Sequence, residues 1–185
     1  MHQSTLFREA TENLFRQTAN AMSFDEKVSA AVNNLKQLLL DGHVFVVAVS
    51  FGKDSSVCLA LALRALKELV EAGHQPATLH VMNSNTQVEN PVIDLFSEGE
   101  IKALDTYVKA HNLPVRFWQA TPNLSNNYLV NIIGGRVIFT FPDTDRKCQQ
   151  MMKANPLAKT KRRIQEAIKE EYGRPVDPEK LLTLI

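Results

Sequence analysis

The chain has 185 residues, 44% hydrophobic residues and a formal net charge of +1. These values fit one well-cored domain, and they exclude a disordered chain and a globally basic protein that wraps nucleic acid. The longest apolar runs stop well short of the roughly 20 residues that a membrane-spanning helix needs, and the first residues lack the layout of a signal peptide. We therefore expect a cytoplasmic protein without a membrane partner.

The two cysteines, Cys58 and Cys148, are too few for a disulfide scaffold and form no metal-spaced cluster. We expect reduced thiols, with Cys58 buried and inert. Charge is distributed unevenly, because seven basic residues and no acidic residue lie between Arg146 and Arg163. This run indicates either an anion-facing surface or a solvated basic helix face.

The first 42 residues predict two helices. Apolar residues recur at helical spacing over residues 4–21, and Ser23 to Glu26 has the form of a capping box that opens a second helix. Gly42 can end that second helix. We expect residues 1–42 to pack as N-terminal helices on a domain formed by residues 43–185.

Strands and helices alternate over the rest of the chain. The β-branched run VFVVAVS, residues 44–50, predicts a strand buried on both faces. Further strands are expected at 78–84, 115–121, 136–141 and from 180, with helices at 54–72, 97–111, 126–133 and 156–172. The order predicts an α/β fold with a doubly wound, mostly parallel sheet of about five strands and helices on both faces.

A polar turn, SFGKDSS at residues 50–56, joins the first strand to the next helix. Ligands of such sheets bind beyond the carboxyl ends of the strands, and a helix start with unpaired N–H groups attracts phosphate. Gly52 allows a tight turn or a close ligand approach. Further donors and a full positive charge come from Ser50, Ser55, Ser56 and Lys53.

Asp54 suits the divalent cation that accompanies a polyphosphate, because a carboxylate can hold the metal directly or through water. The alternative is that Asp54 or Ser55 only caps the helix while Lys53 is solvated. The spacing of the turn matches neither a Walker A loop nor the dinucleotide fingerprint. P-loop kinases and Rossmann dehydrogenases are therefore disfavoured.

The turn resembles the SGGxDS pyrophosphate loop of the adenine nucleotide alpha-hydrolase (PP-loop) superfamily, which includes PAPS reductases and tRNA thiolation enzymes. Three later segments resemble, in order, segments of the Dnd-type DNA phosphorothioation protein C: NTQVENPVIDLF, YLVNIIGG and DRKCQQMMKANPL. The last is also similar to a CCxxRKxxPL element of PAPS reductases. These motifs cover roughly residues 44–160, and the departure is Phe51, where the family has its first glycine.

The resemblance implies a PP-loop (HUP-type) domain over residues 43–185 that cleaves ATP between its α and β phosphates. A substrate oxygen is adenylated, pyrophosphate leaves, and sulfur then displaces AMP. The implied activity is an ATP pyrophosphatase that activates the DNA backbone for sulfur incorporation, with Mg²⁺ as cofactor. DNA, a cysteine desulfurase and other DNA-modification proteins are the implied partners.

Two alternatives stay open. The first is a PAPS or APS reductase-like enzyme, although the C-terminal catalytic cysteine of that class is missing here. The second is a non-catalytic nucleotide-binding subunit. The chain stops just before a phosphate-contacting loop of the family, which suggests a truncated form, a natural short form or a split protein. Cys148 matches a family cysteine, but this chain does not complete a 4Fe-4S cluster.

The resemblance also assigns residues. Catalytic roles fall to Ser50, Lys53 and Asp54, and metal binding to Asp54 and Glu89. Glu89 and Asn90 lie over the nucleotide, with turn chemistry before Pro91 as the alternative for Asn90. The full set expected to bind ATP is Ser50, Phe51, Gly52, Lys53, Asp54, Ser55, Ser56, Met82, Asn83, Ser84, Glu89, Arg146, Lys147 and Lys153.

The remaining aromatic and histidine residues predict no further chemistry. Phe117 and Trp118 are neighbours in a predicted strand, which favours core residues over a base-stacking platform. The five histidines lack zinc-binding spacing and are interpreted as surface or packing residues.

Overall fold

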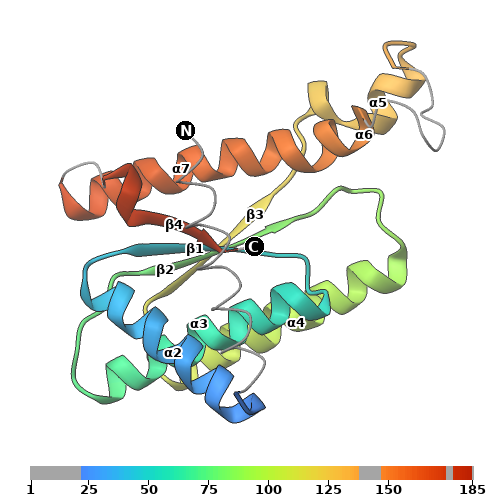
Figure 1. Ribbon diagram of the computed structural model, residues 1–185. Helices are drawn as coiled ribbons and strands as arrows, with labels where there is room; N and C mark the ends of the chain where they lie inside the picture. The colour runs from blue at the N-terminus through green and yellow to red at the C-terminus, as the bar shows by residue number, and fades with distance from the viewer. Residues whose placement is uncertain (1–21, 138–146, 174–176, 185) are drawn as a thin grey trace, which may run out of the picture.

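The computed structural model describes residues 22–137, 147–173 and 177–184. Within them the fold is α/β, with one all-parallel sheet of four strands in the order β3-β2-β1-β4 (Figure 1). The strands are β1 (Val44–Val49), β2 (Leu79–Ser84), β3 (Val115–Ala120) and β4 (Leu181–Leu184). The α/β class and the parallel pairing are confirmed.

The predicted number of five strands is wrong for the described residues. The candidate strand at 136–141 opens with a bend at Arg136 and Val137, and its other residues lie outside the described part of the chain. Arg136 and Val137 instead follow a helix end, where both backbone N–H groups donate to the carbonyl of Asn131.

The register aligns the carboxyl ends of three strands at one edge of the sheet. Val49 of β1 pairs with Asn83 of β2, and Ser84 of β2 pairs with Ala120 of β3. The chain moves outward from β1 to β3 and then returns to place β4 on the other side of β1. The strand order therefore reverses between β1 and β4, which is where ligands of open α/β sheets bind.

Helices cover both faces of the sheet, as predicted (Figure 1). One face carries α2 (Phe24–Leu40), α3 (Lys53–Glu71) and α4 (Pro91–Ala110), and the other carries α7 (Asn155–Tyr172). Alternate residues of β1 serve the two cores: Phe45 and Val47 pack on the side of α3, while Val44 and Val46 pack against α7. This two-sided burial explains why β1 is apolar throughout.

The capping box predicted for the second helix is confirmed. The Ser23 hydroxyl accepts from the Glu26 backbone N–H at 3.3 Å, and the Glu26 carboxylate accepts from the Ser23 N–H at 2.7 Å. Gly42, with a φ of 81°, follows the end of α2. The helix predicted at 4–21 lies outside the described residues.

Helix α4 begins at Pro91 rather than at residue 97. The Asn90 side chain caps it by accepting from the Val92 N–H at 2.9 Å, and proline is favoured in the first turn of a helix. The capping residue Asn90 therefore sets the start of the helix, six residues before the start that the spacing of apolar residues predicted. None of the helices in the described part of the chain combines the length and apolar character that crossing a membrane requires.

The shorter elements lie near the carboxyl edge of the sheet or lead into α7 and β4. The helix predicted at 126–133 is a 3₁₀ turn followed by a short helix. In chain order these elements are η1 (Leu124–Asn126), α5 (Tyr128–Ile133), α6 (Lys147–Gln149), the π-helical turn η2 (Gln150–Ala154) and η3 (Pro178–Lys180).

His80 is buried in β2, on the face covered by α7. Its Nδ1 accepts a hydrogen bond from the Trp118 indole N–H at 3.1 Å, so the ring proton resides on Nε2. Nε2 has no hydrogen-bond partner among the described residues. Burial lowers the pKa of His80 from 6.5 to about 4, because the charged imidazolium would lose its hydration.

We expect stability to fall in acid because of His80. Its pKa is lower in the folded chain than in the unfolded one, so the unfolded state binds more protons between pH 6.5 and 4, and stability is lost as the pH falls. The loss from pH 7 to pH 4 should be roughly 2 to 3 kcal/mol. Denaturant unfolding of His80→Gln should show a shallower pH dependence than the wild type. The exposed His74→Gln control should keep the wild-type slope, and an unchanged slope in His80→Gln would contradict the assignment.

Candidate functional site

The polar turn lies at the carboxyl edge of the sheet, between β1 and α3 and beside the strand-order reversal. Gly52 is the N-cap of α3, and no side chain forms a capping hydrogen bond there. Asp54 and Ser55 lie inside the first turn, so the alternative in which one of them is the N-cap is wrong. The N–H groups of a helix's first turn have no partner within the helix, so those of α3 face solvent or a ligand.

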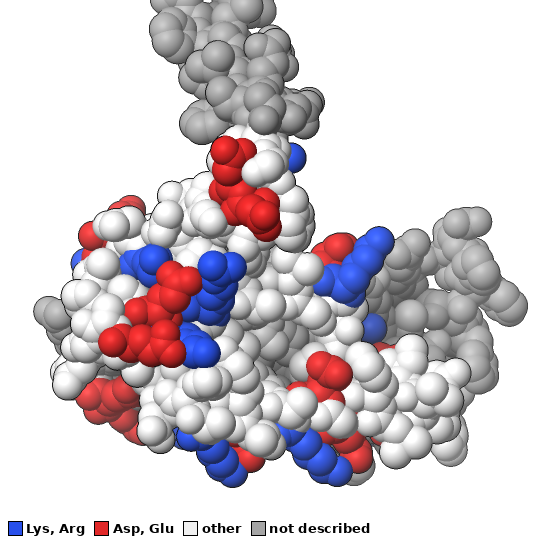
Figure 2. Space-filling model, turned by 90° about the horizontal axis from the view of Figure 1, so that it is seen from below, with Lys and Arg blue, Asp and Glu red and all other residues white. Residues whose placement is uncertain are grey.

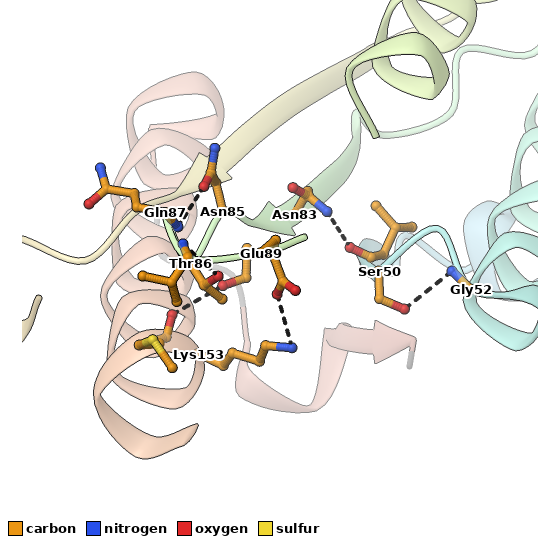
Figure 3. A network of polar contacts seen from close by, with 12 residues as sticks. Ser50, Gly52, Asn83, Asn85, Thr86, Gln87, Glu89 and Lys153 are labelled. Atoms are coloured by element: carbon orange, nitrogen blue, oxygen red, sulfur yellow. Dashed lines mark hydrogen bonds and ion pairs between the residues drawn. The ribbon is translucent and has the colours of Figure 1, made fainter. Parts of the chain in front are cut away.

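Two serine hydroxyls hold the turn closed. Ser55 Oγ donates to the Gly52 carbonyl at 3.0 Å and lies 3.1 Å from Ser50 Oγ. The Gly52 N–H in turn donates to Ser50 Oγ at 3.4 Å (Figure 3). Since Ser55 uses its only proton on Gly52, Ser50 is the donor in the Ser50–Ser55 bond. The predicted donors are therefore close together, and a phosphate would have to draw their protons away from these internal bonds.

Phe51 has the left-handed backbone conformation of the turn. Its φ is 57°, and its side chain is 8% exposed and packs in the core on the side of α3. Such a φ costs a residue other than glycine roughly 1 kcal/mol. Gly52 has a φ of −74°, which any residue adopts. The expectation that Gly52 supplies the tight turn is therefore wrong, and a glycine would fit the backbone at Phe51.

Lys53 and Asp54 are exposed on the first turn of α3. Neither forms an ion pair with any described residue. Their opposite charges are therefore both available to a ligand. In the described part of the chain, no three His, Cys, Asp or Glu side chains gather into a metal site. A nucleotide-bound Mg²⁺ needs only one or two carboxylates besides phosphate oxygens and water, so Asp54 alone fits that requirement.

The end of β2 lies next to the turn. Asn83 is 6% exposed, and its side-chain N–H donates to the Val49 carbonyl at 2.8 Å, immediately before Ser50 (Figure 3). Met82 is buried against α7, and the Ser84 hydroxyl donates to the Met152 carbonyl at 3.4 Å. These three residues, which were predicted to bind ATP, thus lie at the carboxyl edge of the sheet. The role of Asn83 in supporting the turn was not predicted.

Removing the Asn83 side chain should destabilise the protein. In Asn83→Ala the buried Val49 carbonyl loses its side-chain donor, which costs about 1 to 3 kcal/mol. Urea unfolding measures this change. Asn33→Ala, at an exposed position of α2, is the matched control and should alter stability by less than about 0.5 kcal/mol. If Asn83→Ala lowered the free energy of unfolding by no more than Asn33→Ala does, the supporting role of Asn83 would be contradicted.

The loop after β2 is shaped by its own side chains (Figure 3). Asn85 Oδ1 accepts from the Gln87 N–H at 2.8 Å, and the buried Thr86 hydroxyl accepts from the Val88 N–H at 3.4 Å. Asn127, the N-cap of α5, donates to Gln87 Oε1 at 2.9 Å. Side chains that bond their own backbone in this way order a loop without secondary structure.

Glu89 and Lys153 come together at this edge, with Nζ of Lys153 3.4 Å from a Glu89 carboxylate oxygen (Figure 3). They were predicted to bind a metal and a phosphate, respectively, but here they pair with each other. Their side chains are 35% and 52% exposed, so the pair is weak and can open. Lys153 reaches this position from the π-helical turn η2, an element that the sequence did not predict.

The other predicted positions are only partly described. Arg146 lies outside the described residues, and of Lys147 only the backbone, at the start of α6, is described. Cys148 is half-buried. Cys58 is also half-buried, so the expectation that it is fully buried is wrong.

A pocket of about 570 Å³ opens at the opposite edge, where the strands begin. It is lined by Leu39, Leu40, Gly42, Val44, Gln75, Pro76, Ala77, Tyr172, Asp177 and Lys180. Ligands of open parallel sheets bind at the carboxyl ends of the strands, and this pocket lies at the other ends. We therefore place the candidate site at the polar turn.

The structure thus brings the polar turn, the end of β2 and the Glu89–Lys153 pair to one edge of the sheet. Comparisons of the chain with protein-family models, with curated proteins and with solved structures found no match. The function of the site is therefore inferred from its own residues.

Proposed function

We propose that this chain is an ATP pyrophosphatase of the PP-loop (HUP-type) class, with the polar turn as its pyrophosphate cradle. One observation carries the proposal: α3 begins at the carboxyl edge of the sheet with a glycine N-cap, so its first amides lack a side-chain cap. Lys53 and Asp54 stand on the same turn without ion-pair partners among the described residues. This combination favours a phosphate that arrives with a divalent cation.

In the proposed reaction an acceptor oxygen attacks the α-phosphorus of ATP, and the bond to the bridging oxygen of the β-phosphate breaks. Negative charge then builds on the departing pyrophosphate. Lys53 and the first amides of α3 stabilise this charge, because they are already oriented toward the edge where it develops. The hydroxyls of Ser50 and Ser55 turn from each other toward the phosphate oxygens.

Asp54 is the residue of this site that best fits Mg²⁺. When bound, the ion neutralises part of the phosphate charge. Glu89 is engaged by Lys153 and joins Asp54 only when that ion pair opens. Opening the pair would also free Lys153 for the phosphates. Metal binding by Glu89 and phosphate binding by Lys153 therefore both depend on the opening of this ion pair.

The proposed acceptor is the DNA backbone, which adenylation activates for sulfur incorporation. Persulfide sulfur delivered by a cysteine desulfurase then attacks the acceptor and displaces AMP, and a thiol reductant cleaves the resulting S–S bond so that one sulfur atom stays on the acceptor. This assignment is supported by the four motifs and their order along the chain, and by their meeting at one edge: the polar turn, the loop of residues 85–90, α5 and η2 are linked by hydrogen bonds and an ion pair.

Incubation with radiolabelled ATP and Mg²⁺ tests the proposal, with duplex DNA added as acceptor in a parallel reaction. AMP and pyrophosphate are the expected products. Formation of ADP and phosphate, or the absence of nucleotide binding, would contradict it. Release of sulfite from PAPS with a thiol donor would instead support a reductase.

A second candidate, a nucleotide-binding subunit without catalysis, is favoured by one observation. The turn places the buried, bulky Phe51 where the family has glycine. If the chain is such a subunit, it binds ATP without forming AMP. The Phe51→Gly variant should then form AMP if the Phe51 side chain prevents ATP cleavage. Equilibrium dialysis with ATP, run beside the product assay, separates the two candidates.

A further inference from the structure

Two arginine side chains lie close to the ring of Trp118 at the edge strand β3. The guanidinium carbon of Arg116 is 4.5 Å from the centroid of the Trp118 ring, and that of Arg163, from α7, is 5.7 Å from it. The indole N–H is fixed by the buried His80. Cation–π attraction therefore favours this placement of both guanidinium groups, and their N–H groups donate to no residue in the described part of the chain.

The first half of α7 continues this positive surface. Its buried face carries Thr160 and Ile164, and the outward face carries Lys159, Arg162 and Arg163 at spacings of three and four residues. All three outward residues are exposed, as is Arg116. We call Arg116, Lys159, Arg162 and Arg163 the basic face.

No carboxylate among the described residues lies within 4.0 Å of a basic-face nitrogen. The acidic residues of α7 begin only at Glu166, in its second half. The face formed by α2, α3 and α4 differs, because acidic and basic side chains lie next to one another there (Figure 2). Lys36, Arg64 and Lys67 pair with glutamates on that face. The basic face therefore keeps its charge for an external anion.

We propose that the basic face binds the sugar-phosphate backbone of duplex DNA. Arginine forks match phosphate oxygens, and backbone contacts of this kind position a nucleic acid without reading its sequence. Lys159 follows Lys153 by six residues, about 9 Å along the helical segment, so DNA held here extends to the candidate site. The choice of DNA as the nucleic acid rests on the proposed function.

The geometry also favours a duplex over a single strand. Single strands are bound by stacking bases on exposed aromatic rings. Trp118 is half-buried, and the guanidinium groups of Arg116 and Arg163 already lie near its ring. It is therefore not an open platform for a base, and it serves to position cations instead.

Fluorescence anisotropy of a labelled DNA duplex, titrated with the full chain in the absence of nucleotide, tests the proposal. The variant Lys159→Gln/Arg162→Gln/Arg163→Gln should bind at least about tenfold more weakly, and the slope of log K against log salt should fall by about 2 to 3 over about 50–200 mM salt. Lys27→Gln/Lys102→Gln/Lys109→Gln removes the same charge from α2 and α4 and should stay within about twofold of the wild type.

Trp118 provides a second signal, because it is the one tryptophan of the sequence. DNA should change its emission in the wild type and in the control variant. Lys159→Gln/Arg162→Gln leaves the Arg163 contact with Trp118 intact and should still weaken binding about fivefold, with an unchanged thermal midpoint. This variant separates lost phosphate contacts from a disturbed fold.

Three results would overturn the proposal: no binding of DNA at low salt, equal weakening by both triple variants, or tighter binding of single-stranded DNA or duplex RNA than of duplex DNA. The ATP product assay without DNA is independent of all three. If DNA binds through the basic face but no AMP forms, only the proposed function is contradicted. If AMP forms but DNA does not bind through the basic face, only this inference is contradicted.

Discussion

Lys53→Ala is expected to lower AMP formation from ATP about 100-fold or more under the proposed function. Lys53 is the charged donor on the turn that would receive the departing pyrophosphate, and loss of one oriented donor to a developing charge typically has an effect of this size. Lys53 is exposed and has no ion-pair partner among the described residues, so the substitution should leave the fold intact. Initial rates of AMP and pyrophosphate release measure the effect.

Lys67→Ala is the matched control for Lys53→Ala. Lys67 lies on the same helix, α3, but near its other end, where it pairs with Glu71 at 3.7 Å. This exchange removes the same charge and should leave the rate within about twofold of the wild type, because a surface pair contributes little. Equal rates of AMP formation for Lys53→Ala and the wild type would show that the polar turn is not part of a catalytic site.

Phe51→Gly should lower the free energy of unfolding by about 2 to 4 kcal/mol. Truncating a buried phenylalanine typically costs 3 to 5 kcal/mol, while a glycine relieves about 1 kcal/mol of left-handed backbone strain. Urea unfolding monitored by circular dichroism measures the difference. The prediction separates two effects that oppose each other at one position.

Phe51→Ala isolates the strain, because alanine also loses the aromatic ring but keeps a Cβ atom. We expect it to be about 1 kcal/mol less stable than Phe51→Gly, provided that the φ near 57° persists. In an ordinary extended turn glycine would be no better than alanine. An alanine variant as stable as the glycine variant would therefore show that the left-handed conformation contributes no strain.

Much of the fold could be predicted from local patterns. The two-sided apolar run of β1 predicted a buried parallel strand, and Ser23 with Glu26 predicted the start of α2. The position of SFGKDSS between a strand and a helix placed the polar turn at the carboxyl edge of the sheet. These features depend on neighbours in the chain, whose spacing the sequence contains directly.

Other features depended on contacts between distant segments. The family resemblance implied separate ligand roles for Glu89 and Lys153, but only the packing of η2 beside the loop after β2 made them an ion pair. Arg116 and Arg163 meet at Trp118 because α7 crosses the edge strand β3, and neither residue predicts the other along the chain.

The sequence by itself determined the α/β order and the position of the polar turn between a strand and a helix. Only the tertiary structure decided that Phe51, not Gly52, has the left-handed conformation, since burial of the aromatic ring stabilises a backbone that local preference disfavours. It also decided the strand order and the joint surface of α7 and β3. The physical reason is that pairing and burial are properties of surfaces that meet, whereas capping and periodicity are properties of residues that follow one another.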